Sequence, residues 1–328
     1  MKRELLRVYK NKGILIAISL VLIILIIFAC NYVTELSSIN KLRTPYYENF
    51  DEINERIIEL KEAIKNLDSK QYDYSYKLDE YQTLLTFYQF VFDNQIEHAD
   101  LTQNYQSDKA NIYFNSSDSN TPDDRVAYIL TILPTSLIFI MGFVILLCAF
   151  LVNYDFTTGV YKLLYAHNNN RAKIFLRKFL ACLTVTSVVY ALVSVFVAIS
   201  SSLFEVNFTI IIVTESSSAY IVNSNAYIFI EYLTSFTVLM FITLIFFSIS
   251  VMIRNMYLAI LINVIIGIGY YLAYSSESVI LNFAFAELIN CVDAFVPVWV
   301  FIISILLRYT LALGMVYGSK RLLLARQF

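Results

Sequence analysis

The stretch NYDFTTGVYKLLYAHNNNRAKIFLRKF, residues 153–179, lies between two long apolar runs of the chain. It contains five of the chain's 24 basic residues: Lys162, Arg171, Lys173, Arg177 and Lys178. Its first part has helical spacing, which puts these residues on one face: Phe156, Val160, Leu163, Leu164 and His167. Gly159 lies within that face, where the missing side chain lets another backbone come close, and the asparagine triplet 168–170 breaks the helix. The pattern predicts a short amphipathic helix held at a membrane surface by two spanning helices. That geometry suits the transfer of force to a soluble partner.

The composition of the chain indicates a membrane protein. Of its 328 residues, 58% are hydrophobic and 15% are charged, whereas soluble domains average about 45–50% and about 25%. The four cysteines are scattered singly, within or beside apolar runs, so a disulfide framework and a structural zinc are not expected. The two histidines, His98 and His167, are too few and too distant in sequence for a metal site.

Six apolar runs are each close to the ~20 residues that cross a hydrocarbon core of ~30 Å. They predict spans at residues 13–33, 126–152, 176–203, 227–253, 256–274 and 298–318. The predicted fold class is therefore an all-α polytopic membrane protein with six transmembrane helices. The first run has two interpretations, a signal peptide or an uncleaved anchor. The lack of a small-x-small cleavage site before Asn31 favours the anchor.

Basic residues gather on one side of the predicted membrane. Residues 1–12 carry five Lys or Arg and predict an interfacial helix lying on anionic lipid. The segment 153–175 and the tail 319–328 are also basic, whereas the loops 204–226 and 275–297 contain no Lys or Arg. By the positive-inside rule, both termini and the segment 153–175 are expected in the cytoplasm of a multi-pass cell-membrane protein.

The segment 34–125 is then expected outside the cell. Its part from residue 35 to residue 125 contains nine basic and eighteen acidic residues. A first apolar stripe follows a heptad spacing: Ile53, Ile57, Leu60, Ile64 and Leu67. A second helical stripe follows: Leu78, Tyr81, Leu85, Tyr88 and Phe92. These stripes predict an extracellular helical hairpin. It is either a solvated spacer or a cap that gates or receives a substrate, and the sequence leaves both open.

The stretch 153–179 resembles the signature of ABC-2 type transporter permeases. The matching positions are an acid, a glycine four residues later, a Leu-Leu pair, an Arg and a Lys-Phe pair entering a helix: Asp155, Gly159, Leu163, Leu164, Arg171, Lys178 and Phe179. In that family this segment is the coupling helix, which docks into a cleft of the ATP-hydrolysing subunit. The resemblance implies this docking role for Asp155, Phe156, Gly159, Val160, Leu163, Leu164, His167 and Arg171.

The resemblance extends to the whole chain, because the family has six spans, cytoplasmic termini and short membrane-dipping helices between spans five and six. Those helices correspond here to residues 275–297. The implied partners are cytoplasmic ABC ATPase subunits, a second permease copy or sister chain, and membrane lipids. No nucleic acid is expected. ATP and Mg²⁺ are implied only in the partner ATPase, with no cofactor in this chain.

No catalytic motif is visible in the chain. There is no GxxxxGK[ST] sequence to cradle nucleotide phosphates, no HExxH and no Ser-His-Asp constellation. The carboxylates of Asp123 and Asp124 lie in a polar loop and are better explained by solvation than by catalysis. The chain is therefore not expected to be an enzyme.

Arg308 is the costliest residue of the sixth predicted span. It lies about ten residues from either end, where an arginine costs on the order of 3 kcal/mol by insertion scales. Two interpretations are open: the side chain faces a polar interior on a translocation path, with Glu231 as one partner, or it snorkels to the membrane surface.

The sequence leaves two classes of function. The first is the permease subunit of an ATP-driven exporter, whose aromatic-rich bundle favours an amphipathic or apolar cargo such as an antimicrobial peptide or a lipid-linked molecule. The alternative is a membrane receptor or scaffold whose extracellular domain binds a ligand or partner without transport.

Overall fold

The computed structural model describes most of the chain: residues 4, 6, 9, 11–40, 50–67, 74–94, 99–106, 110–115, 124–158, 171–202, 209–214, 219–253, 255–274 and 298–325. Three predicted features lie largely or wholly outside these residues. They are the interfacial helix 1–12, the centre of the segment 153–175 and the membrane-dipping helices 275–297.

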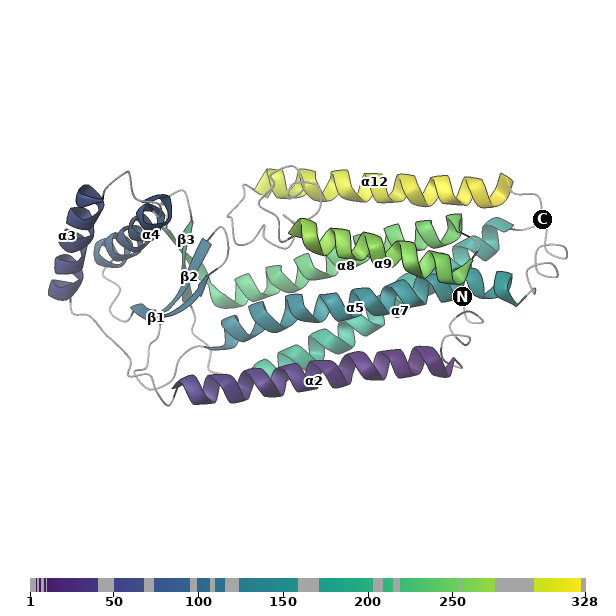
Figure 1. Ribbon diagram of the computed structural model, residues 1–328, viewed down its shortest axis with the longest axis horizontal. Coiled ribbons are helices and arrows are strands. Elements are labelled where there is room, and N and C mark those ends of the chain that lie inside the picture. The colour runs from purple at the N-terminus through teal and green to yellow at the C-terminus, as the bar shows by residue number, and fades with distance from the viewer. Residues whose placement is uncertain are drawn as a thin grey trace.

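Long helices lie side by side along the long axis of the molecule and alternate in direction (Figure 1). They are α2 (Lys12–Asn40), α5 (Asp124–Thr157), α7 (Arg171–Ser201), α8 (Ser224–Met252), α9 (Met256–Tyr274) and α12 (Val298–Ala325). The helix α2 begins and α12 ends at the same end of this bundle, which we call the terminal end (Figure 1). The opposite end, next to the β-strands, is called the sheet end.

Within the described residues, four helices are long and apolar enough to cross a membrane. Their apolar parts are Lys12–Asn31, Thr135–Thr157, Arg171–Ser201 and Ser224–Met252. The chain is therefore a helical, multi-pass membrane protein, as the composition predicts. The apolar part of α9 is shorter, Met256–Gly269, and a count of six spans stays a prediction.

Asparagine side chains cap the N-termini of three of these helices. The Oδ1 atom of Asn11 accepts a hydrogen bond from the backbone N–H of Gly13 at 2.9 Å, at the start of α2. Asn223 accepts from the N–H of Asn225 at 3.0 Å, at the start of α8. Asn255 accepts from the N–H of Tyr257 at 2.9 Å, at the start of α9. These side chains satisfy N–H groups that have no partner within the first turn of a helix.

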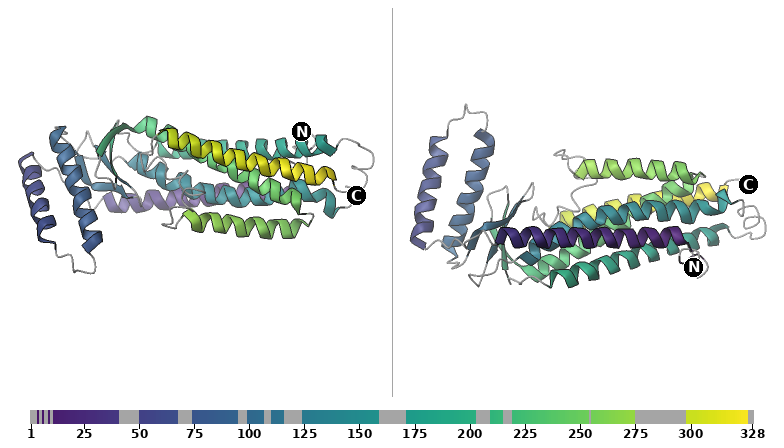
Figure 2. Two further views of the ribbon diagram at one scale, coloured as in Figure 1. Left: turned by 90° about the horizontal axis from the view of Figure 1, so that it is seen from above. Right: turned by 60° about the horizontal axis from the view of Figure 1, so that its bottom comes forward.

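The helices α5 and α8 form the centre of the bundle. They pack against each other, α5 also contacts α2, α7 and α9, and α8 also contacts α7, α9 and α12. Their buried residues are mostly large and apolar, and those least exposed to solvent include Ile140, Val144, Leu147, Phe246 and Phe247. The helix α2 lies at the periphery (Figure 2).

Two helices stand beyond the sheet end of the bundle, α3 (Phe50–Asn66) and α4 (Tyr74–Asp93) (Figure 2). They pack on each other around a second, smaller core of Ile53, Ile57, Phe87, Tyr88 and Val91. The two predicted amphipathic helices are thus present as a packed pair.

A four-stranded antiparallel sheet lies between this pair and the bundle (Figure 1). Its strands are β1 (Ala99–Gln106), β2 (Ala110–Asn115), β3 (Thr209–Thr214) and β4 (Ala219–Asn223), in that spatial order. The central pairing joins segments far apart in sequence, with Ile112 opposite Ile212. The strand β4 continues into α8 with no intervening residue, because Asn223 ends the strand and caps the helix.

The sheet corrects the prediction of an all-α chain. Residues 204–226 were predicted as a plain loop, yet they contain β3 and β4. The physical reason is composition: the runs TIIIVT and AYIVN are rich in β-branched residues, which favour the extended backbone of a pleated sheet. The helical prediction holds for the bundle and for α3 and α4.

Candidate functional site

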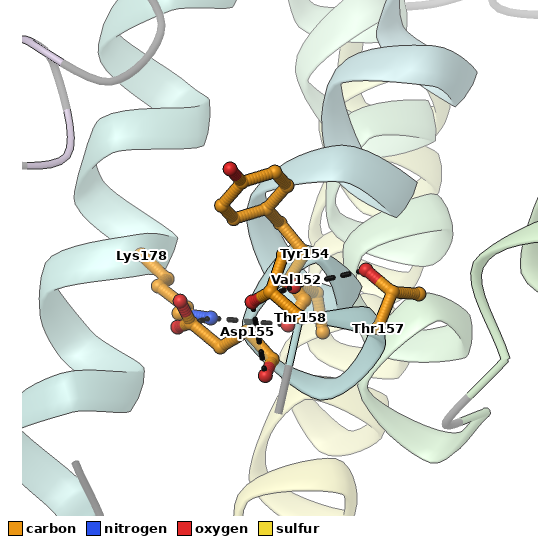
Figure 3. A network of polar contacts seen from close by, with 6 residues as sticks. All are labelled: Val152, Tyr154, Asp155, Thr157, Thr158 and Lys178. Carbon is orange, nitrogen blue, oxygen red and sulfur yellow. Dashed lines mark hydrogen bonds and ion pairs between the residues drawn. The ribbon is translucent and has the colours of Figure 1, made fainter. Parts of the chain in front are cut away.

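The last turn of α5 leads into the segment that the sequence singles out. The helix runs to Thr157, five residues beyond the predicted end of the span at residue 152. The hydroxyls of Thr157 and Thr158 donate hydrogen bonds to the carbonyl oxygen of Tyr154, at 2.9 and 2.8 Å. The backbone N–H of Thr158 donates to the same oxygen at 3.1 Å. These bonds hold the end of the helix in a defined geometry (Figure 3).

A buried ion pair joins this turn to α7. The Nζ atom of Lys178 lies 2.7 Å from Oδ2 of Asp155, and the two side chains are only 5% and 1% exposed. The same Nζ donates a hydrogen bond to the carbonyl oxygen of Val152 at 3.0 Å. Lys178 therefore contacts α5 at two points, one side chain and one backbone atom (Figure 3).

The burial of this pair sets its energetic role. Moving two charges out of water costs several kcal/mol per ion, and their attraction offsets that cost only when the geometry is good. The pair is therefore a weak source of net stability. Loss of one partner, in contrast, leaves an uncompensated buried charge and costs about 3–5 kcal/mol. The pair thus fixes how α5 and α7 meet at the terminal end, where the segment between them begins and ends.

Aromatic rings pack beside the pair. Phe175 and Phe179, on either side of Lys178 along α7, contact Phe247 of α8 with ring centroids 5.4 and 5.3 Å apart. Both contacts are edge-to-face, a favourable geometry for aromatic rings. The start of α7 is thereby seated on α8 as well as on α5.

Further polar contacts link the other helices at the terminal end. The Nδ2 atom of Asn153 donates to the carbonyl oxygen of Ser250 at 3.2 Å, from α5 to α8. The Nδ2 atom of Asn263 donates to Oγ of Ser250 at 3.0 Å, from α9 to α8. The Nη1 atom of Arg171 lies 3.5 Å from the carbonyl oxygen of Leu324, from α7 to α12. A displacement of the α5–α7 pair would therefore be passed to α8, α9 and α12.

The predicted docking residues fall into two groups. Asp155, Phe156 and Arg171 are described, and none of them stands as an isolated surface side chain. Asp155 faces α7, Phe156 packs partly buried against the main core, and Arg171 is the first residue of α7. The others lie outside the described residues: Gly159, Val160, Leu163, Leu164 and His167.

The structure puts Arg308 inside the protein. Its side chain is 3% exposed in α12, and Glu231 of the neighbouring helix α8 is also 3% exposed. A snorkelling side chain facing lipid would be exposed, so the interior interpretation agrees with this burial. The hydroxyl of Tyr309 donates to the carbonyl oxygen of Thr237 at 2.8 Å, which sets the level at which the two helices meet.

Glu231 lies six residues before Thr237, about 9 Å nearer the sheet end at about 1.5 Å per residue. Side chains in a helix lean toward its N-terminus. Because α8 and α12 both run from the sheet end to the terminal end (Figure 1), the Arg308 side chain leans toward the level of Glu231.

Two features of this site were missed from the sequence. The sequence identifies Lys178 as a basic residue entering a helix, but it does not indicate the pairing with Asp155, which lies on the other side of the same segment. The contact of Asn153 with Ser250 carried no sequence signal, because the two residues lie 97 positions apart. Among the described residues, no group of three or more His, Cys, Asp or Glu side chains is placed to hold a metal ion.

Comparison of the chain with known protein families, curated proteins and solved structures gives no match in any of the three.

Proposed function

We propose that the chain is the permease subunit of an ABC-2 type ATP-driven exporter. A separate ATPase would bind the segment between α5 and α7 and pull on it as ATP is bound and hydrolysed. Two such ATPases and a second permease would complete the transporter, with the terminal end of the bundle in the cytoplasm and α3, α4 and the sheet outside.

The observation that carries this proposal is the buried contact between Asp155 and Lys178, 2.7 Å long. Because the two helices that flank the segment are tied at its base, a displacement that the segment passes to one helix would move both. The contacts of Asn153 and Arg171 extend the tie to α8 and α12. A force on the segment would thus tilt the bundle as a unit, which is what alternating exposure of a transport path requires.

The cargo proposed for this permease is amphipathic or apolar. The described core of the bundle is built from large aliphatic and aromatic side chains, and its buried charges are few. Arg308 and Glu231, buried on adjacent helices, are proposed to line the path and to meet a charged group of the cargo.

The receptor alternative has one observation in its favour. Because β4 runs directly into α8, a ligand bound to the sheet or to α3 and α4 could act on the bundle without any transport. Co-purification separates the two functions: an ATPase that accompanies the chain supports transport, whereas a kinase or regulator without an ATPase supports the receptor.

The docking prediction is tested by replacing Leu163 and Leu164 with Asp together. Burying an unpaired carboxylate in an apolar interface costs more than the 1.4 kcal/mol that corresponds to a tenfold change in affinity. Recovery of the ATPase in a pull-down should therefore fall by about tenfold or more. The matched control replaces Leu322 and Leu324 with Asp, since these are exposed leucines near the end of α12. Equal recovery with the 163/164 variant and the wild type would exclude this segment as the docking element.

A further inference from the structure

Two cysteines that are distant in sequence meet in the interior of the bundle. The Sγ atoms of Cys148 in α5 and Cys182 in α7 lie 3.2 Å apart, both residues are 0% exposed, and both are free thiols. Cys148 also lies 4.0 Å from the carbonyl oxygen of Thr243 in α8. Nothing in the sequence indicates this contact, because the two residues lie 34 positions apart, on either side of the segment 159–170.

The thiols lie on the same helix faces as the ion pair. Cys182 is four residues beyond Lys178 in α7, and Cys148 is seven residues before Asp155 in α5, and both separations return a helix to the same face. The contact is therefore a second tie between α5 and α7, about one to two turns deeper in the bundle than the first.

We propose that Cys148 and Cys182 form an oxidisable dithiol, a modification site that a lipid-soluble two-electron oxidant of the azo or quinone class converts into a disulfide joining α5 to α7. Each thiol gives up one proton and one electron, the sulfurs form one S–S bond, and the oxidant takes up two electrons and two protons. A quinone becomes a quinol and an azo compound becomes a hydrazine.

The geometry explains both the reaction and its selectivity. A disulfide bond is about 2.05 Å long, so the sulfurs need to approach by only about 1.2 Å, a change within reach of side-chain rotation. Because neither sulfur is exposed, a charged oxidant dissolved in water cannot reach them. Access is restricted to oxidants that enter the apolar interior.

The consequence for transport rests on the proposed function. In that proposal α5 and α7 are already tied by the Asp155–Lys178 pair and move together, so a covalent bond between them would leave the transmitted motion unchanged. The oxidised protein should therefore keep its fold, its ATPase and its export.

Counting free thiols tests the site without reference to transport. The full-length protein in lipid vesicles is treated with diamide, an uncharged azo oxidant, or with tetrathionate, a charged one. It is then denatured and labelled with a maleimide polymer that adds one gel shift per thiol. The wild type has four cysteines, so we expect four shifts before oxidation. We expect two shifts after diamide and four after tetrathionate.

Three variants identify the pair. Cys148→Ser and Cys182→Ser should each keep three shifts after diamide, whereas Cys30→Ser should fall from three to one. The proposal is overturned if the wild type keeps four shifts after diamide, or if Cys148→Ser loses two. If the disulfide forms and export by the oxidised protein falls well below that of the reduced protein, the site stands and the role assigned to α5 and α7 as one moving unit in the proposed function fails.

Discussion

At the scale of single residues, the buried charges of the described part of the chain lie on helices that pack against each other. Lys178 and Asp155 meet within 2.7 Å at the base of the segment between α5 and α7. Arg308 and Glu231 are buried on α12 and α8. A buried charge is costly in an apolar interior, so each of these residues constrains the position of its neighbours more strongly than an apolar side chain of the same size would.

Removing one partner of the ion pair should be much worse than removing both. Lys178→Met leaves the carboxylate of Asp155 buried without its partner and should lower the free energy of unfolding by about 3–5 kcal/mol. The double variant Asp155→Leu with Lys178→Met should recover most of that loss. Thermal unfolding of the detergent-solubilised protein, followed by the loss of monodisperse material, is the measurement. The control is Lys173→Met, an exposed lysine of α7, and additive effects of the two pair mutations would contradict a coupled pair.

Replacing Arg308 should affect export more than membrane insertion. Hydrogen bonds to charged groups contribute about 1.5–3 kcal/mol, so Arg308→Leu should lower export roughly ten- to a hundredfold at an unchanged membrane level. Arg308→Lys keeps the charge but loses the planar fork of donors and should also impair export. Export is measured relative to membrane protein level and basal ATPase rate. Arg321→Leu, which removes an exposed arginine stacked on Tyr317, serves as the control, and wild-type export by both Arg308 variants would exclude a role on the path.

At the scale of secondary-structure elements, the helices were largely readable from the sequence. The apolar runs of the bundle are long, and periodic stripes mark α3 and α4. The predicted apolar stripe of α4 is slightly out of phase with the buried face of the helix. Phe87 and Val91 are 1% exposed, whereas Phe92, a residue of the predicted stripe, is 39% exposed. A stripe with aromatic residues at adjacent positions fits more than one helical face, and packing against α3 selects among them.

The sheet was not readable in the same way. The runs that form β3 and β4 have the composition of strands and are separated by a short polar stretch, which is a hairpin signal. The lack of Lys and Arg in residues 204–226 predicts only an outer loop, because charge alone does not distinguish a loop from a hairpin. The pairing of β2 with β3 could not be predicted at all, since it joins two loops on either side of α5 and α7 and depends on their packing.

The register of β2 and β3 can be tested by cross-linking. Ile112 and Ile212 are directly opposite, within the Cα separation that a disulfide bridges. With the four native cysteines replaced by serine, Ile112→Cys combined with Ile212→Cys should form a disulfide on mild oxidation. Ile112→Cys combined with Val213→Cys should not, because a shift of one residue turns the side chain to the other face of the sheet. Equal cross-linking of both pairs would mean that the register is wrong, and maleimide labelling after denaturation measures it.

At the scale of the whole molecule, the bundle separates two regions of different chemistry. At the terminal end α5 ends and α7 begins, within the basic segment 153–175. The sheet end carries α3, α4 and the sheet, which come mainly from the acidic segment 34–125 (Figure 2). This separation is the basis for expecting the two ends on opposite sides of a membrane.

Labelling of intact cells tests that orientation. A cysteine placed at Ser69, between α3 and α4, should react with a membrane-impermeant maleimide from outside. One placed at Asn169 should react only after the cells are lysed. Reaction of both positions from outside, or of neither, would contradict the predicted topology. The cysteine-free chain serves as the control for background labelling.

The pairing of β2 with β3 also dictates an order of events during synthesis. The paired residues are about 100 positions apart, as Ile112 and Ile212 are, and a ribosome adds roughly 5–20 residues per second. The strands β1 and β2 therefore wait roughly 5–20 s for their partner, while α5 and α7 enter the membrane. A two-stranded ribbon is at best marginally stable in water, so during this interval one edge of β2 is open to chaperones, proteases and other chains. A complete sheet therefore indicates that α5 and α7, which lie between β2 and β3 in the chain, have been inserted.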